Sequence, residues 1–283
     1  MTRRYSACNK HRMSEPKPPP TPSAAVILLR DAPAGIEVLM QRRREQATAF
    51  AGVVVFPGGK VAAVDAHPDF HAAADLGAPQ PFEPARQLAA LRELFEESAI
   101  LLARGRGDAE ARARLLPHRE RLDRNPELWP ALLAEHGLRL AADLLVPWAR
   151  WVTPEFAPRR FDSTLFAAAA PEGQAPIGGR EADEYLWARP ADLLAAADRE
   201  ELYLVFVTRM NLMRLARHAT VAEALEAGRR GPHPTIQPKK AETPAGDMVR
   251  IPPDAPYPVH ELPFKYTSTA VDARRRENLA RKP

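Results

Sequence analysis

Three glutamates, Glu93, Glu96 and Glu97, are the residues of this 283-residue sequence whose type and spacing most clearly predict chemistry. They lie in a segment, 84–104, that an initial proline and a helical period of apolar residues predict to be a helix. At about 100° per residue, the three carboxylates share one side of this helix. The apolar side chains of the opposite side are Leu88, Leu91, Phe95, Ala99 and Leu102.

A solvated acidic face is the common explanation for such a run of charge, but three details count against it. Glu93 and Glu97 form a like-charge pair four residues apart, which destabilises a helix without a counterion. The cluster lies in mid-helix, where the macrodipole offsets little. No basic residue stands three or four positions further along the helix from any of the three glutamates. A hard divalent cation would resolve the repulsion, and from the helix alone both interpretations stay open.

A double glycine, Gly58-Gly59, follows the apolar segment 53–56 directly and precedes Lys60. Glycine allows positive φ and a close approach of the backbone to other groups, which suits a turn that braces a helix or faces a phosphate. A double glycine is more often a plain turn. Its significance here comes from its pairing with the acidic helix.

Together these segments resemble the signature of the Nudix hydrolases. Gly59 is followed after five residues by Asp65, and the run RELFEESAI at 92–100 matches the second half of the signature at all but one place. Twenty-six residues separate Asp65 from Arg92 where the family has seven, Asp65 stands where glutamate is usual, and Ala99 replaces a glycine. The insertion, together with the sequence FPGGKV at 56–61, resembles the Nudix branch that acts on CoA and acyl-CoA.

The resemblance implies an α/β (α+β) fold, the Nudix α/β/α sandwich with a mixed sheet and a helical insertion at about 106–140. It also implies that Mg²⁺ or Mn²⁺ is held by the glutamates of the helix and a carbonyl of Gly59, while Arg92 fixes a carboxylate, that of Glu93. The general base would be Glu93 or Glu181, and Glu181 is equally well explained as a surface acid. The metal ligands so implied are Glu93, Glu96, Glu97 and Gly59.

Five arginines are candidates for binding substrate phosphates: Arg42, Arg43 and Arg44 after the second strand, and Arg159 and Arg160 at the start of a later one. Guanidinium groups bind phosphate oxygens bidentately, although solvated arginines at strand edges explain each of them equally well. CoA or acyl-CoA is the first-choice substrate, with 3′,5′-ADP and an (acyl-)phosphopantetheine as products. The alternatives are a diphosphatase for ADP-ribose, NADH or a nucleotide sugar, and a non-catalytic Nudix ligand sensor.

The elements that must position these residues can be read from apolar periodicity. Early strands precede the acidic helix, a helical block at 108–135 follows it, and strands and helices then alternate, which gives an α+β or mixed α/β domain. We expect a disordered leader at 1–22, a Nudix domain at 23–228 and a Pro-rich basic tail or surface arm at 229–283; Met13 is a second candidate start. The predicted strands are 24–29, 36–40, 53–56, 148–153, 161–169 and 184–188, and the later helices are 190–197 and one or two within 202–227.

Composition narrows the class of protein further. No run approaches the roughly 18 to 20 apolar residues that a membrane span requires, and the single cysteine, Cys8, excludes intramolecular disulfides. We therefore predict a cytoplasmic protein that does not contact a membrane, and the resemblance implies a small nucleotide-like partner. The net charge of +4 is modest, and the basic residues near the end of the chain indicate solvated tails rather than a nucleic-acid surface. A homodimer remains open.

Overall fold

The computed structural model describes residues 18–43, 52–105, 108–178, 182–244 and 246–280. Its centre is an eight-stranded mixed sheet in which β10, β7, β8, β1, β2 and β3 lie side by side in that order, while β4 pairs with β1 and β9 with β2. β1 runs parallel to β8 and antiparallel to β2. The strand bounds are β1 Thr21–Ala32, β2 Gly35–Arg43, β3 Val54–Val55, β4 Gly58–Lys60, β7 Val146–Val152, β8 Phe161–Ala169, β9 Ala182–Ala188 and β10 Thr235–Ile236.

The side chains of β1 divide between two hydrophobic cores, one on each face of the sheet. Val26 and Leu28 contribute to the core beneath the acidic helix, whereas Ile27 and Leu29 contribute to the core on the other face. Successive side chains of a strand point to opposite faces, and a strand buried on both faces therefore appears in the sequence as a continuous apolar run. The sheet is thus the middle layer of three.

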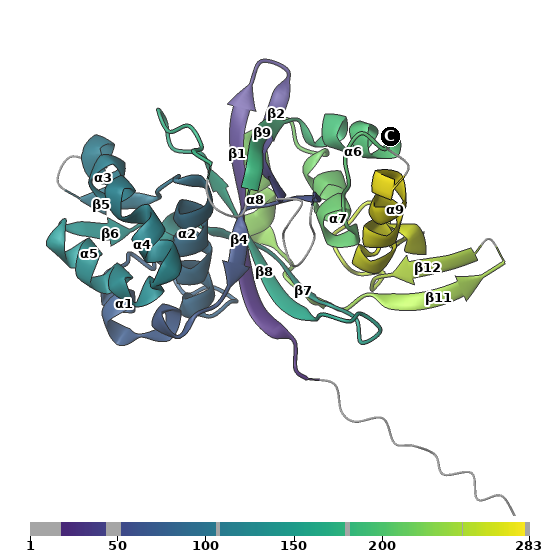
Figure 1. Ribbon diagram of the computed structural model, residues 1–283, viewed down its shortest axis with the longest axis horizontal. Coiled ribbons are helices and arrows are strands. Elements are labelled where there is room, and N and C mark those ends of the chain that lie inside the picture. The colour runs from purple at the N-terminus through teal and green to yellow at the C-terminus, as the bar shows by residue number, and fades with distance from the viewer. Residues whose placement is uncertain (1–17, 44–51, 106–107, 179–181, 245, 281–283) are drawn as a thin grey trace, which may run out of the picture.

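Helices cover both faces of the sheet, as Figure 1 shows. On one face lie the acidic helix α2 (Pro84–Ser98) and the helical insertion, which comprises α3 (Asp108–Leu115), α4 (Arg119–Arg124) and α5 (Trp129–Glu135). The other face carries α6 (Pro190–Asp198), α7 (Phe206–Leu215) and α8 (Val221–Arg230). This arrangement confirms the predicted α/β/α sandwich with a mixed sheet and a helical insertion.

The acidic helix begins at Pro84, as the sequence predicts, but it ends at Ser98 rather than near residue 104. Ala99 ends it because this residue adopts a left-handed conformation, with φ at 60°. Such a residue commonly terminates helices, and glycine is favoured there since it has no Cβ. Between β4 and α2 lies a short helix, α1 (Pro68–Ala72). A two-stranded sheet of β5 (Ala103–Gly105) and β6 (Leu138–Leu140) frames the insertion.

Residues 229–283, for which the sequence predicted a tail or surface arm, supply regular structure to the fold. β10 extends the central sheet along β7, and the apolar side chains of Ile251 and Tyr257 are buried in the second core. Because the segment is rich in proline, its apolar residues show no helical or strand periodicity that would have predicted their burial. The remaining elements are β11 (Lys239–Thr243), β12 (Gly246–Arg250) and β13 (Glu261–Pro263), which form a small sheet, and α9 (Ser268–Ala280).

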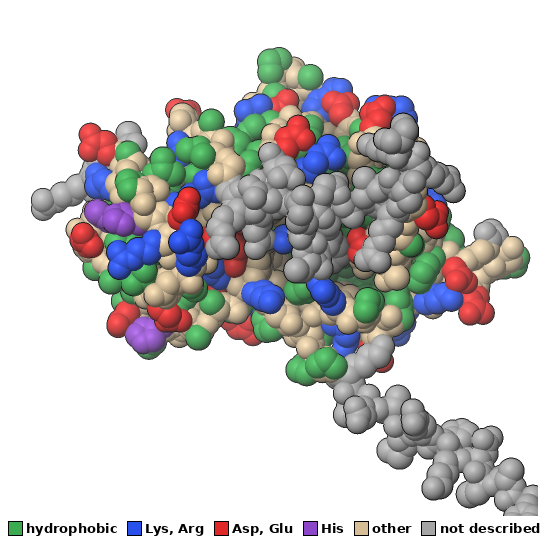
Figure 2. Space-filling view, in the orientation of Figure 1, with side chains coloured by type: hydrophobic (Ala, Val, Ile, Leu, Met, Phe, Trp, Pro, Cys, Tyr) green, Lys and Arg blue, Asp and Glu red, His purple; other side chains and the backbone are tan. Residues whose placement is uncertain are grey.

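At the other end of the chain, most of the expected leader at 1–22, with Met13, lies outside the described residues, and β1 begins at Thr21. Among the described residues, no helix is long and apolar enough to cross a membrane. On the face shown in Figure 2, the described acidic and basic side chains are interspersed.

Candidate active site

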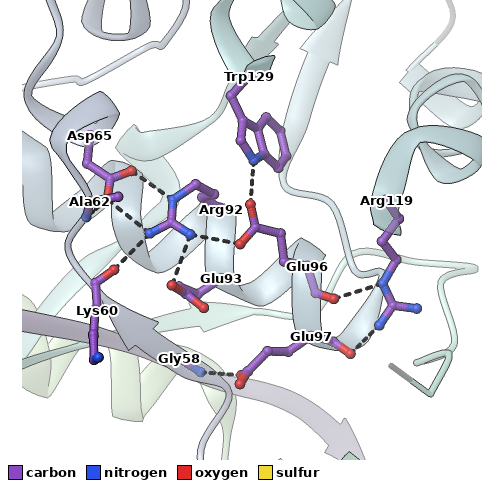
Figure 3. Close-up of polar contacts among 10 residues, drawn as sticks. All are labelled: Gly58, Lys60, Ala62, Asp65, Arg92, Glu93, Glu96, Glu97, Arg119 and Trp129. Atoms are coloured by element: carbon purple, nitrogen blue, oxygen red, sulfur yellow. Dashed lines mark hydrogen bonds and ion pairs between the residues drawn. The ribbon is translucent and has the colours of Figure 1, made fainter. Parts of the chain in front are cut away.

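The guanidinium of Arg92 lies at the centre of the acidic cluster (Figure 3). Its Nη1 donates to Oε1 of Glu93 at 2.9 Å and to Oε2 of Glu96 at 2.7 Å. Its Nε and Nη2 donate to the two carboxylate oxygens of Asp65 at 2.9 and 3.0 Å, and Nη2 also donates to the carbonyl of Lys60 at 2.8 Å. Arg92 therefore joins the glycine turn, the Asp65 segment and two glutamates of α2 in one buried network.

The glycine turn lies directly against the acidic helix. The backbone N–H of Gly58 donates to Oε2 of Glu97 at 2.7 Å, and the same oxygen accepts from Nε2 of Gln41 at 2.8 Å. At the next position, a Cβ on Gly59 would overlap the carboxylate of Glu93. Only glycine allows the backbone and the carboxylate to approach this closely. The double glycine is therefore a part of the site and not a plain turn.

Burial shifts the proton equilibria within this cluster. It raises the pKa of Glu96 to about 8, although the charge of Arg92 acts in the opposite direction. Burial also lowers the pKa of Arg92, but the hydrogen bond to Asp65 and the charges of Glu93 and Glu96 outweigh it and hold that pKa above its ordinary value. Burial thus disfavours negative charge on Glu96, and a cation bound beside it would favour the ionised carboxylate.

The helical insertion also contacts α2. Trp129 of α5 donates from Nε1 to Oε1 of Glu96 at 2.7 Å. Arg119, at the start of α4, donates from Nε to the carbonyl of Glu96 at 2.9 Å and from Nη2 to the carbonyl of Glu97, while its Nη1 reaches the carbonyl of Gly178 at 3.0 Å. A cation that hydrogen-bonds to the last carbonyls of a helix also complements the helix dipole.

A cavity of about 1090 Å³ opens beside these groups. Its wall includes Glu93 and Glu96 of α2 and also Arg159 and Arg160, from the segment between β7 and β8. Other charged side chains in its wall come from Arg43, Lys60 and Asp123. A cavity of this size accommodates a ligand considerably larger than a diphosphate.

Of the arginines proposed for substrate phosphates, Arg43, Arg159 and Arg160 reach the cavity. Arg42 does not line it: its Nε donates to Oε2 of Glu184 on the neighbouring strand β9, at 3.1 Å. Arg44 and Glu181 lie outside the described residues.

Several site residues escaped the sequence reasoning. Lys60 directly follows the double glycine, and this proximity was the available signal. Trp129, Arg119 and Asp123 come from the insertion, whose alanine- and arginine-rich sequence carries no motif.

The donors of this site suit a hard divalent cation. The carboxylates of Glu93, Glu96 and Glu97 and the backbone of the Gly59 turn offer oxygen ligands of the kind Mg²⁺ binds. Within the described part of the chain, no group of three or more acidic, histidine or cysteine side chains is already arranged around a single point. Arg92 lies between Glu93 and Glu96 instead. The chemistry of the residues fits a metal, and binding would require these carboxylates to adjust around Arg92.

Comparisons with known proteins match the sequence to a family model and the fold to solved structures. A family model described as the NUDT19 Nudix domain matches residues 70–215, just over half of the chain. A solved NUDIX hydrolase from Alicyclobacillus acidocaldarius is 28% identical with a TM-score of 0.63, over 75% of this chain and 98% of that one. More distant are a MutT NUDIX hydrolase from Burkholderia pseudomallei (17% identity, TM-score 0.39, 68% of this chain and 95% of that one) and the NUDIX domain of Shewanella oneidensis NrtR, solved with ADP ribose (14%, 0.39, 70% and 86%).

Proposed function

The chain belongs to the Nudix hydrolase family and is a hydrolase of diphosphate bonds; from this premise we propose that its substrate is CoA or an acyl-CoA. The products would be 3′,5′-ADP and phosphopantetheine or its acyl derivative. The observation that carries the proposal is the cavity of about 1090 Å³, whose wall includes the acidic residues Glu93 and Glu96 and the basic residues Arg159 and Arg160. A substrate that carries a diphosphate and a further phosphate has anionic groups for a cation held by the acids and for the arginines.

We assign Glu93, Glu96, Glu97 and the carbonyl of Gly59 as ligands of Mg²⁺ or Mn²⁺. When bound, the cation neutralises the charge of the diphosphate and acidifies a water molecule. Arg92 orients the carboxylates of Glu93 and Glu96 through its Nη1. Glu93 accepts the proton of the attacking water in this proposal, and Glu181, outside the described residues, is the alternative base.

Of the basic residues in the wall, Arg159 and Arg160 would bind the 3′-phosphate. Arg160 already donates from Nε to the carbonyl of Thr153 at 3.2 Å, a contact that fixes the direction of its guanidinium. A guanidinium fixed in this way loses less rotamer entropy when it binds phosphate. Phe161, which follows in the cavity wall, offers an apolar surface to the adenine. A cytoplasmic location and a homodimer stay predictions.

Product analysis by mass spectrometry tests the substrate assignment. The purified protein with Mg²⁺ would be given CoA, acetyl-CoA, ADP-ribose and NADH separately, and we expect 3′,5′-ADP from the first two at the highest kcat/KM. Higher kcat/KM on ADP-ribose or NADH would replace CoA by those substrates. Hydrolysis of none of the four, with binding of one, would indicate a ligand sensor.

One pair of variants and one single variant assayed on two substrates test the residue assignments. Glu97→Gln should abolish turnover while the protein stays folded, whereas Glu120→Gln, an exposed acid of the insertion, should retain it. Arg160→Ala should raise KM for CoA about tenfold or more, since a charge-assisted contact to phosphate is lost. It should leave KM for 3′-dephospho-CoA nearly unchanged. Equal effects on both substrates would contradict the placement of the 3′-phosphate.

A further inference from the structure

Trp129 is the residue of the insertion that contacts a carboxylate of the acidic helix. Its side chain is fully buried, and its indole Nε1 donates to Oε1 of Glu96 at 2.7 Å. The ring packs edge-to-face on Phe95, with centroids 5.5 Å apart, and lies tilted against Phe70 at 6.1 Å. Because these ring contacts fix the indole, its N–H points in one direction.

The carboxylate of Glu96 is consequently held from two sides. Oε1 accepts from Trp129, and Oε2 accepts from Nη1 of Arg92 at 2.7 Å. One donor on each oxygen determines both the rotamer and the plane of the carboxylate. Each oxygen of an ionised carboxylate has two acceptor positions, so a single donor still leaves each oxygen able to bind a further partner.

The insertion fixes the backbone at the same place. Arg119 donates to the backbone carbonyls of Glu96 and Glu97, the two acidic residues in the last turn of α2. Arg119 and Trp129 lie ten residues apart in the insertion, and one contacts the backbone of Glu96 while the other contacts its side chain (Figure 3). The main chain and the carboxylate of Glu96 are thus both positioned from outside α2.

We propose that Trp129 is a positioning residue whose indole N–H sets the orientation in which Glu96 presents its carboxylate to the catalytic cation, a role that rests on the proposed assignment of Glu96 as a ligand. Donors behind a ligand hold it in its binding orientation, so that the ligand does not have to be ordered when the metal arrives. Removing such a donor typically weakens metal binding about 10- to 100-fold.

The test is Mn²⁺ affinity of the metal-free protein, measured by electron paramagnetic resonance of free Mn²⁺. Trp129→Phe removes the N–H and keeps an aromatic ring against Phe95. Trp148→Phe is the matched control, because Trp148 is also fully buried and donates its N–H, at 2.9 Å, to Asn211 in the other core. We expect the Kd for Mn²⁺ to rise about tenfold or more in Trp129→Phe and less than about twofold in the control.

A second measurement requires no change at Trp129. In the ¹⁵N spectrum, the four tryptophans give four indole N–H signals, and Phe variants of Trp148, Trp151 and Trp187 assign the signal of Trp129 by elimination. Mg²⁺ should shift the Trp129 signal, because the acceptor Glu96 loses electron density to the cation, and should shift the other three much less. An unmoved Trp129 signal in a protein that binds Mg²⁺ would overturn the proposal.

The outcomes separate this inference from the function on which it rests. If the wild-type protein binds Mn²⁺ and Trp129→Phe binds it equally well, the positioning role fails while the metal site stands. If the wild-type protein binds no Mn²⁺, or Glu97→Gln binds it unchanged, the assignment of the metal site itself fails.

Discussion

Asp65→Asn should destabilise the protein far more than the loss of a surface ion pair, because Asp65 is buried and binds Arg92 through both of its carboxylate oxygens. Both residues are buried, with exposed fractions of 0% and 3%. The two oxygens of Asp65 accept from Nε and Nη2 of Arg92, and Oδ2 also accepts from the backbone N–H of Ala62 at 2.7 Å. Asparagine keeps the shape of the side chain but turns one of these acceptors into a donor.

No neighbour can take over the lost contacts. Glu93 and Glu96 both accept from Nη1, on the other side of the guanidinium from Nε. In Asp65→Asn, either Nε or Nη2 of Arg92 therefore faces an amide donor on a fully buried side chain. Breaking a buried pair by altering one partner costs about 3–5 kcal/mol. At an m-value of about 3 kcal/mol/M, the midpoint of urea unfolding should fall by about 1.0–1.7 M.

Asp143→Asn is the matched control. Asp143 also binds an arginine through both oxygens, with Arg104 Nη1 at 2.5 Å and Nη2 at 2.9 Å, but this pair is exposed to solvent. Exposed pairs contribute about 0–1 kcal/mol, so the midpoint should shift by no more than about 0.3 M. Circular dichroism in urea measures both variants. Equal shifts for the two would refute the claim that Asp65 stabilises the site through its burial beneath Arg92.

Three further predictions concern the glycine turn, the ion pair of Asp162 and the metal requirement. Gly59→Ala should lower kcat about 10- to 100-fold, because its Cβ would displace the Glu93 carboxylate; Gly178→Ala, with open space around its Cβ, should match the wild type, and equal rates for both would be contrary evidence. The hydrogen bond from Arg150 holds the pKa of Asp162 below its usual range. The resulting stability is present above the unfolded pKa near 4 and is lost as pH falls through the folded pKa. In acid titrations, the difference in unfolding free energy between the wild type and Asp162→Asn should therefore shrink below about pH 4. EDTA should stop hydrolysis and Mg²⁺ should restore it, whereas undiminished turnover in EDTA would exclude a metal requirement.

The sequence predicted elements whose signals are local. Strand β8 has the predicted bounds, because nine consecutive residues form an apolar-rich run that begins after a pair of arginines. α2 begins at the predicted proline, since proline suits the first helical turn. The end of α2 was missed because the apolar period continues beyond Ala99. The available signal was that Ala99 replaces a glycine of the family signature, since glycine is favoured at a left-handed residue that ends a helix.

Contacts between distant segments were beyond the reach of periodicity. Consecutive arginines at the end of β2 show why: Arg42 pairs with Glu184 of β9, whereas Arg43 reaches the cavity. Successive residues of a strand face opposite sides, and the pairing of β2 with β9 shifts register between these two residues. Which arginine faces the substrate therefore depends on a pairing with a strand some 140 residues away. The same holds for Trp129, 33 residues beyond Glu96 in the sequence.

Helix spacing missed a basic residue that contacts the acidic helix's carboxylates. Repulsion between Glu93 and Glu97 predicts a cation, and no basic residue lies three or four positions further along the helix from these glutamates. Arg92 lies four positions before Glu96 and one before Glu93, and it binds both. A single guanidinium cannot neutralise three glutamates together with Asp65, which leaves the cluster with net negative charge when all four are ionised. Arg92 thus orders the carboxylates, and the remaining charge gives a divalent cation its affinity for the site.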